Sequence, residues 1–168
     1  MWNFGSLPEA NMSQTQVAAD SVRLGDRAES AVIESVDGLE YVPDSEGEHY
    51  DAEPVTAIGP SDELDFAGIA VLERGVPIEI KSCIPRLSSG QRGRFYLRRG
   101  QHDRLADDGG IYLFAVVSPH DREPITCKVA AALSVEDVIP SWRDAGAGRQ
   151  QYSQISWPSI FDVSEVRR

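Results

Sequence analysis

The stretch Asp65-Phe-Ala-Gly-Ile-Ala-Val-Leu-Glu-Arg-Gly-Val-Pro-Ile-Glu-Ile-Lys81 carries the strongest signal in this sequence. Two apolar runs flank the turn residues Glu73-Arg74-Gly75, which predicts a hairpin of two short strands. Side chains alternate between the faces of a strand, so Glu79 and Lys81 point the same way. The hairpin would bring the second strand back beside the first, and we expect Asp65 to lie close to Glu79. The stretch therefore predicts that the carboxylates of Asp65 and Glu79 and the amine of Lys81 lie close together in space.

This arrangement resembles the PD-(D/E)XK nuclease superfamily, in which an Asp, and then Glu-x-Lys on the next strand, bind a divalent metal and cleave phosphodiester bonds. The resemblance implies that Asp65, Glu79 and the main-chain carbonyl of Ile80 hold Mg²⁺ or Mn²⁺ through oxygen ligands. It also implies that Lys81 orients or helps to deprotonate the attacking water. Asp62 lies in a Pro-Ser-Asp sequence close to the Pro-Asp of the family name, and it is the alternative to Asp65 as first ligand.

A second motif lies toward the amino terminus. Apolar residues spaced three, four and seven apart predict a helix from Ser13 or Gln14 to Ser35. Within it, Gly25-Asp-Arg-Ala-Glu29 resembles the Gly-x-x-x-Glu pattern of archaeal Holliday junction resolvases and their relatives, where the glutamate faces the metal site. The resemblance implies that Glu29 holds a second metal or a metal-bound water. An exposed Glu29 paired with a neighbouring arginine is the alternative.

The residues that follow Glu-x-Lys are basic. No Asp or Glu occurs between Lys81 and His102. The resemblance implies that the arginines of this segment grip the DNA backbone, and these are Arg86, Arg92, Arg94, Arg98 and Arg99. Gln101-x-x-x-Leu105, on a short helix that Gly109-Gly110 would end, resembles a glutamine motif of some superfamily members. Gln101 is therefore expected at the site or against DNA.

The chain as a whole is acidic, with a net charge of −11 and 27 Asp and Glu against 16 Lys and Arg. Only two of those cations are lysines, and a composition of this kind resembles proteins of salt-accumulating archaea. Arginine is the usual cation of this chain, yet position 81 is a lysine. This indicates that a compact ammonium group is needed at Lys81. No apolar run is long enough to span a membrane and no signal segment is visible, so we expect a cytoplasmic protein without a membrane partner.

The remaining pattern predicts an α/β domain. We expect a strand at Leu39–Val42, an acidic solvated loop or extended excursion over Pro43–Pro54, a central strand at Ile111–Ser118 and its partner at Ile125–Ala132. The resemblance implies a restriction-endonuclease-like core in the order α-β-β-β-α-β-β-α, with a central mixed sheet flanked by helices. We divide the chain into a flexible segment 1–12, a nuclease-like domain 13–140 and an extension 141–168 that packs on the domain or on a partner.

These features together imply a Mg²⁺-dependent DNA endonuclease of repair or recombination, structure-specific in the manner of a Holliday junction resolvase. Junction resolvases act as symmetric dimers, so a homodimer would be expected for that activity. One alternative is a catalytically inactive member of the fold that binds DNA or protein. Another is an unrelated acidic α/β domain in which Glu79 and Lys81 form a surface ion pair, worth only about 0–1 kcal/mol.

Overall fold

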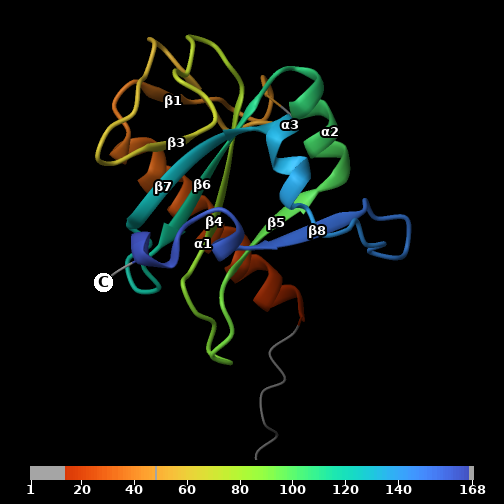
Figure 1. The fold of residues 1–168 in the computed structure, drawn as a ribbon. Helices are drawn as coiled ribbons and strands as arrows, with labels where there is room; N and C mark the ends of the chain where they lie inside the picture. The colour runs from red at the N-terminus through yellow and green to blue at the C-terminus, as the bar shows by residue number, and fades with distance from the viewer. Residues whose placement is uncertain (1–13, 48, 167–168) are drawn as a thin grey trace, which may run out of the picture.

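The computed structural model describes residues 14–47 and 49–166 (Figure 1). The segment 1–12, expected to be flexible, lies outside these residues. Within them the chain forms a six-stranded mixed sheet and a separate two-stranded ribbon, with helices on both sides of the sheet. The α/β class and the central mixed sheet flanked by helices are confirmed. No helix of the described residues is both long and apolar enough to cross a membrane.

The six strands lie in the order β1-β2-β4-β6-β7-β3. Their bounds are Leu39–Tyr41 for β1, Ala52–Pro54 for β2, Asp65–Ala67 for β3, Ile78–Cys83 for β4, Ile111–Val117 for β6 and Pro124–Ala131 for β7. Every residue of β6 is buried, because it lies between parallel β4 and antiparallel β7 and is covered on both faces. The central strand and its partner are thus confirmed, and they form the rigid support on which β4 is held.

Helix α1, Gln14–Ser35, crosses one face of the sheet (Figure 1). Ala28 and Val32 of the helix, and Val36 directly after it, are buried in a core shared with Ile78 and Ile80 of β4. The helix bounds predicted from the sequence are confirmed. Gly25 lies inside the helix, and no atom of the described residues comes within 4 Å of the position that a Cβ would take there. Neither a helix start nor a close packing contact explains this glycine.

The other face of the sheet is covered by several short elements. These are α2 at Arg99–Asp107, α3 at Ala132–Val135, the ribbon strands β5 at Arg94–Arg98 and β8 at Tyr152–Ser156, and the 3-10 segments Glu136–Val138, Trp157–Ser159 and Val163–Glu165. Strands β5 and β8 pair antiparallel. Phe95 and Leu97 of β5 pack in one core with Ile155, Trp157 and Phe161. The carboxyl-terminal segment therefore packs on the domain, while the division of the chain at residue 140 stays a prediction.

The predicted hairpin is wrong. The turn at Arg74-Gly75 is present, but Leu72 before it bonds with Ile58 rather than with β4. Strand β3 pairs parallel with β7 at the far edge of the sheet, and β4 pairs with β2 and β6 instead. Strand β2 lies at the end of the stretch that we expected to be a solvated loop. A three-residue strand buries too little surface to specify its partner locally, so pairing is decided by the rest of the sheet.

Candidate active site

Glu79 and Lys81 lie on the same face of β4, and Lys81 Nζ donates a hydrogen bond to Glu79 Oε1. Glu79 is only 2% exposed, and its Oε2 has no hydrogen-bond partner among the described residues. The pKa of Glu79 is raised to about 8, chiefly by burial and also by the Asp51 carboxyl group, while the Lys81 charge acts in the opposite direction. The carboxyl group therefore holds a proton at neutral pH and keeps one buried oxygen free for a ligand.

Asp51, directly before β2, is the second carboxyl group of this site. Its main-chain N–H donates to the carbonyl of Ile78 at 2.8 Å, and its Oδ2 accepts from the N–H of Ile80 at 2.7 Å. These two bonds fix Asp51 against β4 on either side of Glu79. Burial raises the pKa of Asp51, while the Ile80 N–H and the Lys81 charge act in the opposite direction. The antiparallel pairing of β2 with β4 thus places an acid where the hairpin was expected to place Asp65.

Gln101, in the first turn of α2, completes the contacts of Lys81. Lys81 Nζ donates to Gln101 Oε1 at 3.1 Å. The Lys81 side chain remains 17% exposed, so the ammonium group lies between a buried carboxyl group and solvent. The structure therefore brings together Glu79, Lys81 and Gln101, three of the residues selected from the sequence.

Glu29 of α1 belongs to the same electrostatic cluster. Its pKa is raised to about 7, first by burial and then by the charges of Asp51, Asp26 and Asp44, and the Lys81 charge lowers it. The alternative of an exposed Glu29 is not found, because the residue is half-buried. Three carboxyl groups with raised pKa values lie around one lysine, and this makes the cluster a candidate functional site.

The donor set fits a hard divalent cation. Mg²⁺ takes oxygen ligands and is commonly held by one or two carboxylates together with water and substrate phosphate. Asp51 and Glu79 supply carboxyl oxygens, and Glu79 Oε2 is buried without a partner. Within the described part of the chain, no three His, Cys, Asp or Glu side chains already surround one point. A cation would therefore rely on these two carboxyl groups and on ligands other than protein side chains.

A family model for the PD-(D/E)XK nuclease superfamily domain matches residues 14–162. This chain belongs to the PD-(D/E)XK nuclease superfamily. The match covers most of the chain and runs through β8 into the carboxyl-terminal segment. The mixed sheet between helices is consistent with the restriction-endonuclease-like fold expected from the sequence. A search of curated proteins and a search of solved structures each found no match.

Two acids proposed as superfamily ligands lie elsewhere. Asp65 begins β3, which is an edge strand of the sheet and is separated from β2 by β4, β6 and β7. Its carboxylate forms an ion pair with Lys128 of β7, with the two charged groups 3.3 Å apart. Asp62 is exposed in the loop that leads into β3. The expected approach of Asp65 to Glu79 is therefore wrong, because β6 and β7 separate β3 from β4.

Asp51 is the residue that sequence reasoning missed. It lies in a stretch rich in Asp, Glu and Pro, which reads as a solvated loop. The available signal was the alternation of Tyr50, Ala52 and Pro54, of which Ala52 and Pro54 are buried. That alternation marks a short strand with an acid at its start.

The basic segment of this superfamily member is exposed. Arg86 and Arg92 lie in the loop between β4 and β5, where they form an isolated bridge, and Arg94 and Arg98 point outward from β5. None of these four forms an ion pair with another described residue. Arg99, at the start of α2, forms an ion pair with Asp103, with Arg99 Nε 3.8 Å from Asp103 Oδ2.

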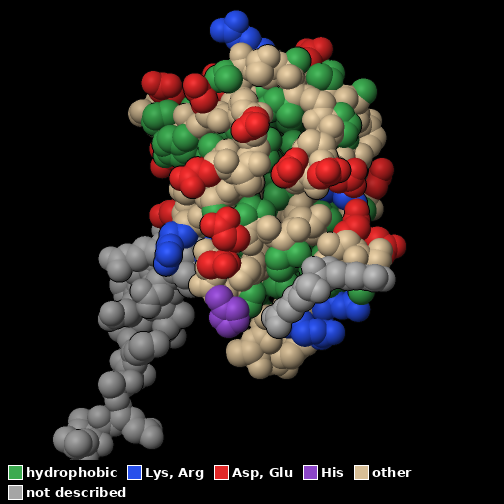
Figure 2. Space-filling view, turned by 90° about the vertical axis from the view of Figure 1, so that its left-hand side faces the viewer, with side chains coloured by type: hydrophobic (Ala, Val, Ile, Leu, Met, Phe, Trp, Pro, Cys, Tyr) green, Lys and Arg blue, Asp and Glu red, His purple; other side chains and the backbone are tan. Residues whose placement is uncertain are grey.

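Figure 2 shows Asp and Glu side chains spread over the side of the molecule that faces left in Figure 1. Positive charge is thus concentrated around β5.

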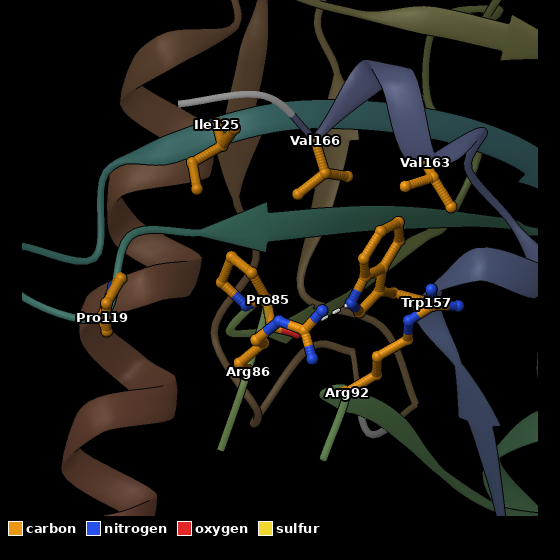
Figure 3. A pocket seen from close by; sticks show the side chains of 8 residues that line it. All are labelled: Pro85, Arg86, Arg92, Pro119, Ile125, Trp157, Val163 and Val166. Carbon is orange, nitrogen blue, oxygen red and sulfur yellow. Dashed lines mark hydrogen bonds between the residues drawn. The ribbon is translucent and has the colours of Figure 1, made fainter. Parts of the chain in front are cut away.

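A cavity of about 410 Å³ lies at the outer end of the basic segment (Figure 3). Arg86 and Arg92 point toward Trp157 in its wall, and the Arg92 guanidinium lies 5.6 Å from the centre of that ring. Trp157 Nε1 donates to the carbonyl of Pro85 at 2.9 Å, which fixes the ring. Val163 and Val166 form part of the opposite wall. Among the described residues, no Asp or Glu lines this cavity, and neither Asp51 nor Glu79 belongs to its wall.

Proposed function

We propose that this protein is a divalent-metal-dependent DNA endonuclease that hydrolyses phosphodiester bonds. The observation that carries the proposal is the meeting of Asp51, Glu79 and Lys81 at β4, with Gln101 bonded to the lysine. In this assignment Asp51 takes the role of the first Asp of the superfamily name, and Glu79-Ile80-Lys81 takes the role of Glu-x-Lys. Tyr50 stands before Asp51, so the Pro of the name is not matched.

The cation site consists of Asp51, Glu79 and the main-chain carbonyl of Ile80, with Mg²⁺ or Mn²⁺ as the ion. A divalent cation held there would offset negative charge on the phosphate and activate the attacking water. Because burial keeps Glu79 protonated, this carboxyl group must lose its proton before it can bind the cation. Binding of the ion is therefore expected to strengthen as pH rises toward about 8.

Lys81 is the residue that acts on the water and on the phosphate. The water oxygen attacks phosphorus and its proton passes to solvent, the bond from phosphorus to the leaving oxygen breaks and that oxygen takes up a proton, and negative charge grows on the phosphate oxygens in the transition state. An ammonium group beside this point stabilises that charge. Gln101 is a positioning residue in this account, because its Oε1 accepts from Lys81 Nζ and holds the amine in place. Glu29 is placed to hold a second cation or a water.

The arginines are assigned to DNA. Arg86, Arg92, Arg94 and Arg98 are exposed and carry no carboxylate partner among the described residues, so their charges are free for phosphates. Contacts of this kind give affinity without reading sequence. We further propose a structure-specific activity of the Holliday junction resolvase kind, in the cytoplasm and in repair or recombination. Two matched cuts at a junction need two sites, which predicts a homodimer.

The test is cleavage of branched and linear DNA with Mg²⁺ or Mn²⁺, at low and at molar KCl, by the wild type and by Glu79→Ala and Lys81→Ala. The proposal predicts metal-dependent cutting that both substitutions abolish. DNA that is bound but never cut by the folded wild type would instead support the inactive binding module. Arg74→Ala, an exposed arginine in the turn before β4, is the matched control and should cut normally.

A further inference from the structure

The outward face of the β5–β8 ribbon carries an aromatic pair. Residues alternate along β5, so Phe95 and Leu97 are buried in the core while Arg94, Tyr96 and Arg98 face outward. Tyr96 remains 44% exposed. Its ring stacks on that of Tyr152 from β8, with the ring centres 5.2 Å apart and the planes 14° from parallel. Core packing does not account for these rings, because the buried residues of β5 point the other way.

The same face is free of acids. The register places Tyr96 opposite Gln154, Arg98 opposite Tyr152 and Arg94 opposite Ser156. Arg94 and Arg98 therefore flank Tyr96 along the strand, each about 6.6 Å away. In a chain with 27 Asp and Glu, a strand face made of two arginines, two tyrosines and neutral polar residues is a local exception. Its charge complements phosphate.

Two connections lead from this face to the carboxyl groups. Arg94 lines a groove together with Gly25 of α1 and Cys83 of β4, and Cys83 lies on the same face of β4 as Lys81. At the other end of β5, Arg98 leads directly into α2, whose Gln101 bonds with Lys81. A strand of nucleic acid that lies along the ribbon can therefore reach the candidate active site.

We propose that the outward face of the β5–β8 ribbon binds an unpaired segment of the DNA substrate, with bases stacked on Tyr96 and Tyr152 and phosphates on Arg94 and Arg98. Aromatic rings bind bases by stacking, which requires an open base face. In a duplex those faces are covered by neighbouring base pairs, so the tyrosines select single-stranded or branched DNA. This inference rests on the proposed nuclease function and names its substrate class.

The first test is binding without metal, in the presence of a chelator so that no cutting occurs. Fluorescence anisotropy would compare a single strand, a blunt duplex of the same length and a duplex with an unpaired arm. We expect the wild type to prefer both DNAs with unpaired bases. Tyr96→Ala/Tyr152→Ala should lose about tenfold or more of that affinity, with blunt-duplex binding unchanged. Tyr96→Phe/Tyr152→Phe keeps the ring faces and should bind as the wild type does.

The outcomes separate this inference from the proposed function. If the folded double Ala variant binds single strands as the wild type does, the ribbon proposal is overturned, even where Mg²⁺-dependent cutting is observed. If the variant loses the preference but the wild type cuts nothing, the ribbon proposal stands and the nuclease proposal fails. Tyr96→Ala alone provides the same comparison should the double variant unfold. A change of molecular mass in the double variant would assign the face to a contact between copies and overturn the proposal.

Discussion

The two lysines of the chain serve different purposes. Lys81 contacts Glu79 and Gln101 and remains partly exposed at the candidate active site. Lys128, on β7, donates to Glu165 at 3.1 Å and to the carbonyl of Ile160 at 3.3 Å, and it pairs with Asp65. Lys128 therefore joins the carboxyl-terminal segment to the sheet. The same type of residue is thus used once for chemistry, as we propose, and once for structure.

Substitution of each lysine by Met should separate these purposes. Lys128→Met should lower the free energy of unfolding by roughly 1–3 kcal/mol, because it removes hydrogen bonds to charged groups, and should leave cutting intact. Lys81→Met should leave stability nearly unchanged, since the protonated Glu79 carries no charge to be stranded, and should lower the cutting rate about 10²-fold or more. Urea unfolding and DNA cleavage measure the two effects. Loss of cutting in a folded Lys128→Met protein would contradict the assignment of Lys128 to structure and Lys81 to chemistry.

Glu79 makes the stability of the metal-free protein depend on pH. Burial raises its pKa from 4.5 in the unfolded chain to about 8 in the folded protein. Between these values the folded state binds more protons than the unfolded state, so stability falls as pH rises. The contribution is complete below about pH 4.5 and is lost above about pH 8.

We therefore expect the free energy of unfolding, measured in a chelator, to decrease from about pH 5 to pH 8 by up to about 1.4 kcal/mol per pH unit for this one proton. Glu79→Gln should make the slope shallower, whereas Glu40→Gln, on the exposed side of β1, should not change it. Unfolding by urea at several pH values is the measurement. Equal slopes in wild type and Glu79→Gln would show that Glu79 does not hold the proton.

Long elements were predictable from the sequence, and the pairing of short ones was not. The pattern of α1 spans several turns, and β6 is a continuous apolar run, so both are determined by their own residues. Strand β3 has three residues, and its partner β7 lies far along the chain. The contacts of Glu79 and Lys81 follow from strand alternation within β4. Asp51 was missed because its position depends on the pairing of β2 with β4, which no local pattern expresses.

Gly25 provides a prediction about α1. Glycine inside a helix costs about 1 kcal/mol relative to alanine, and no neighbour here requires the absence of a side chain. Gly25→Ala should therefore raise the free energy of unfolding by about 1 kcal/mol. Gly25 lines the groove shared with Ser82 and Arg94, so we expect the added methyl group to weaken DNA binding there.

The matched control for Gly25→Ala is Ser30→Ala, an exposed position on the same helix. It should leave DNA binding unchanged. Urea unfolding and anisotropy on the same preparations give both quantities. A Gly25→Ala protein that is more stable and binds DNA as tightly as the wild type would remove the groove from the proposed DNA path.

The charge of the whole molecule predicts a response to salt. The net charge is −11, and Asp and Glu side chains are spread over a broad side of the molecule (Figure 2). These carboxylates repel one another and destabilise the folded state. The screening length falls from roughly 10 Å at 0.1 M to roughly 3 Å at 1 M salt. Thermal unfolding should therefore shift to higher temperature with KCl, most steeply over the first few hundred millimolar. A midpoint that falls with KCl over this range would contradict the importance of self-repulsion.

The central claim is that Asp51, and not Asp65, completes the site of Glu79 and Lys81. The most direct measurement is the Mg²⁺-dependent cutting rate of Asp51→Asn and Asp65→Asn, on DNA that the wild type cuts, with folding of each variant checked by circular dichroism. We expect Asp51→Asn to lose at least about 10²-fold in rate and Asp65→Asn to stay close to the wild type. A folded Asp51→Asn protein that cuts normally, beside an inactive Asp65→Asn, would contradict the account.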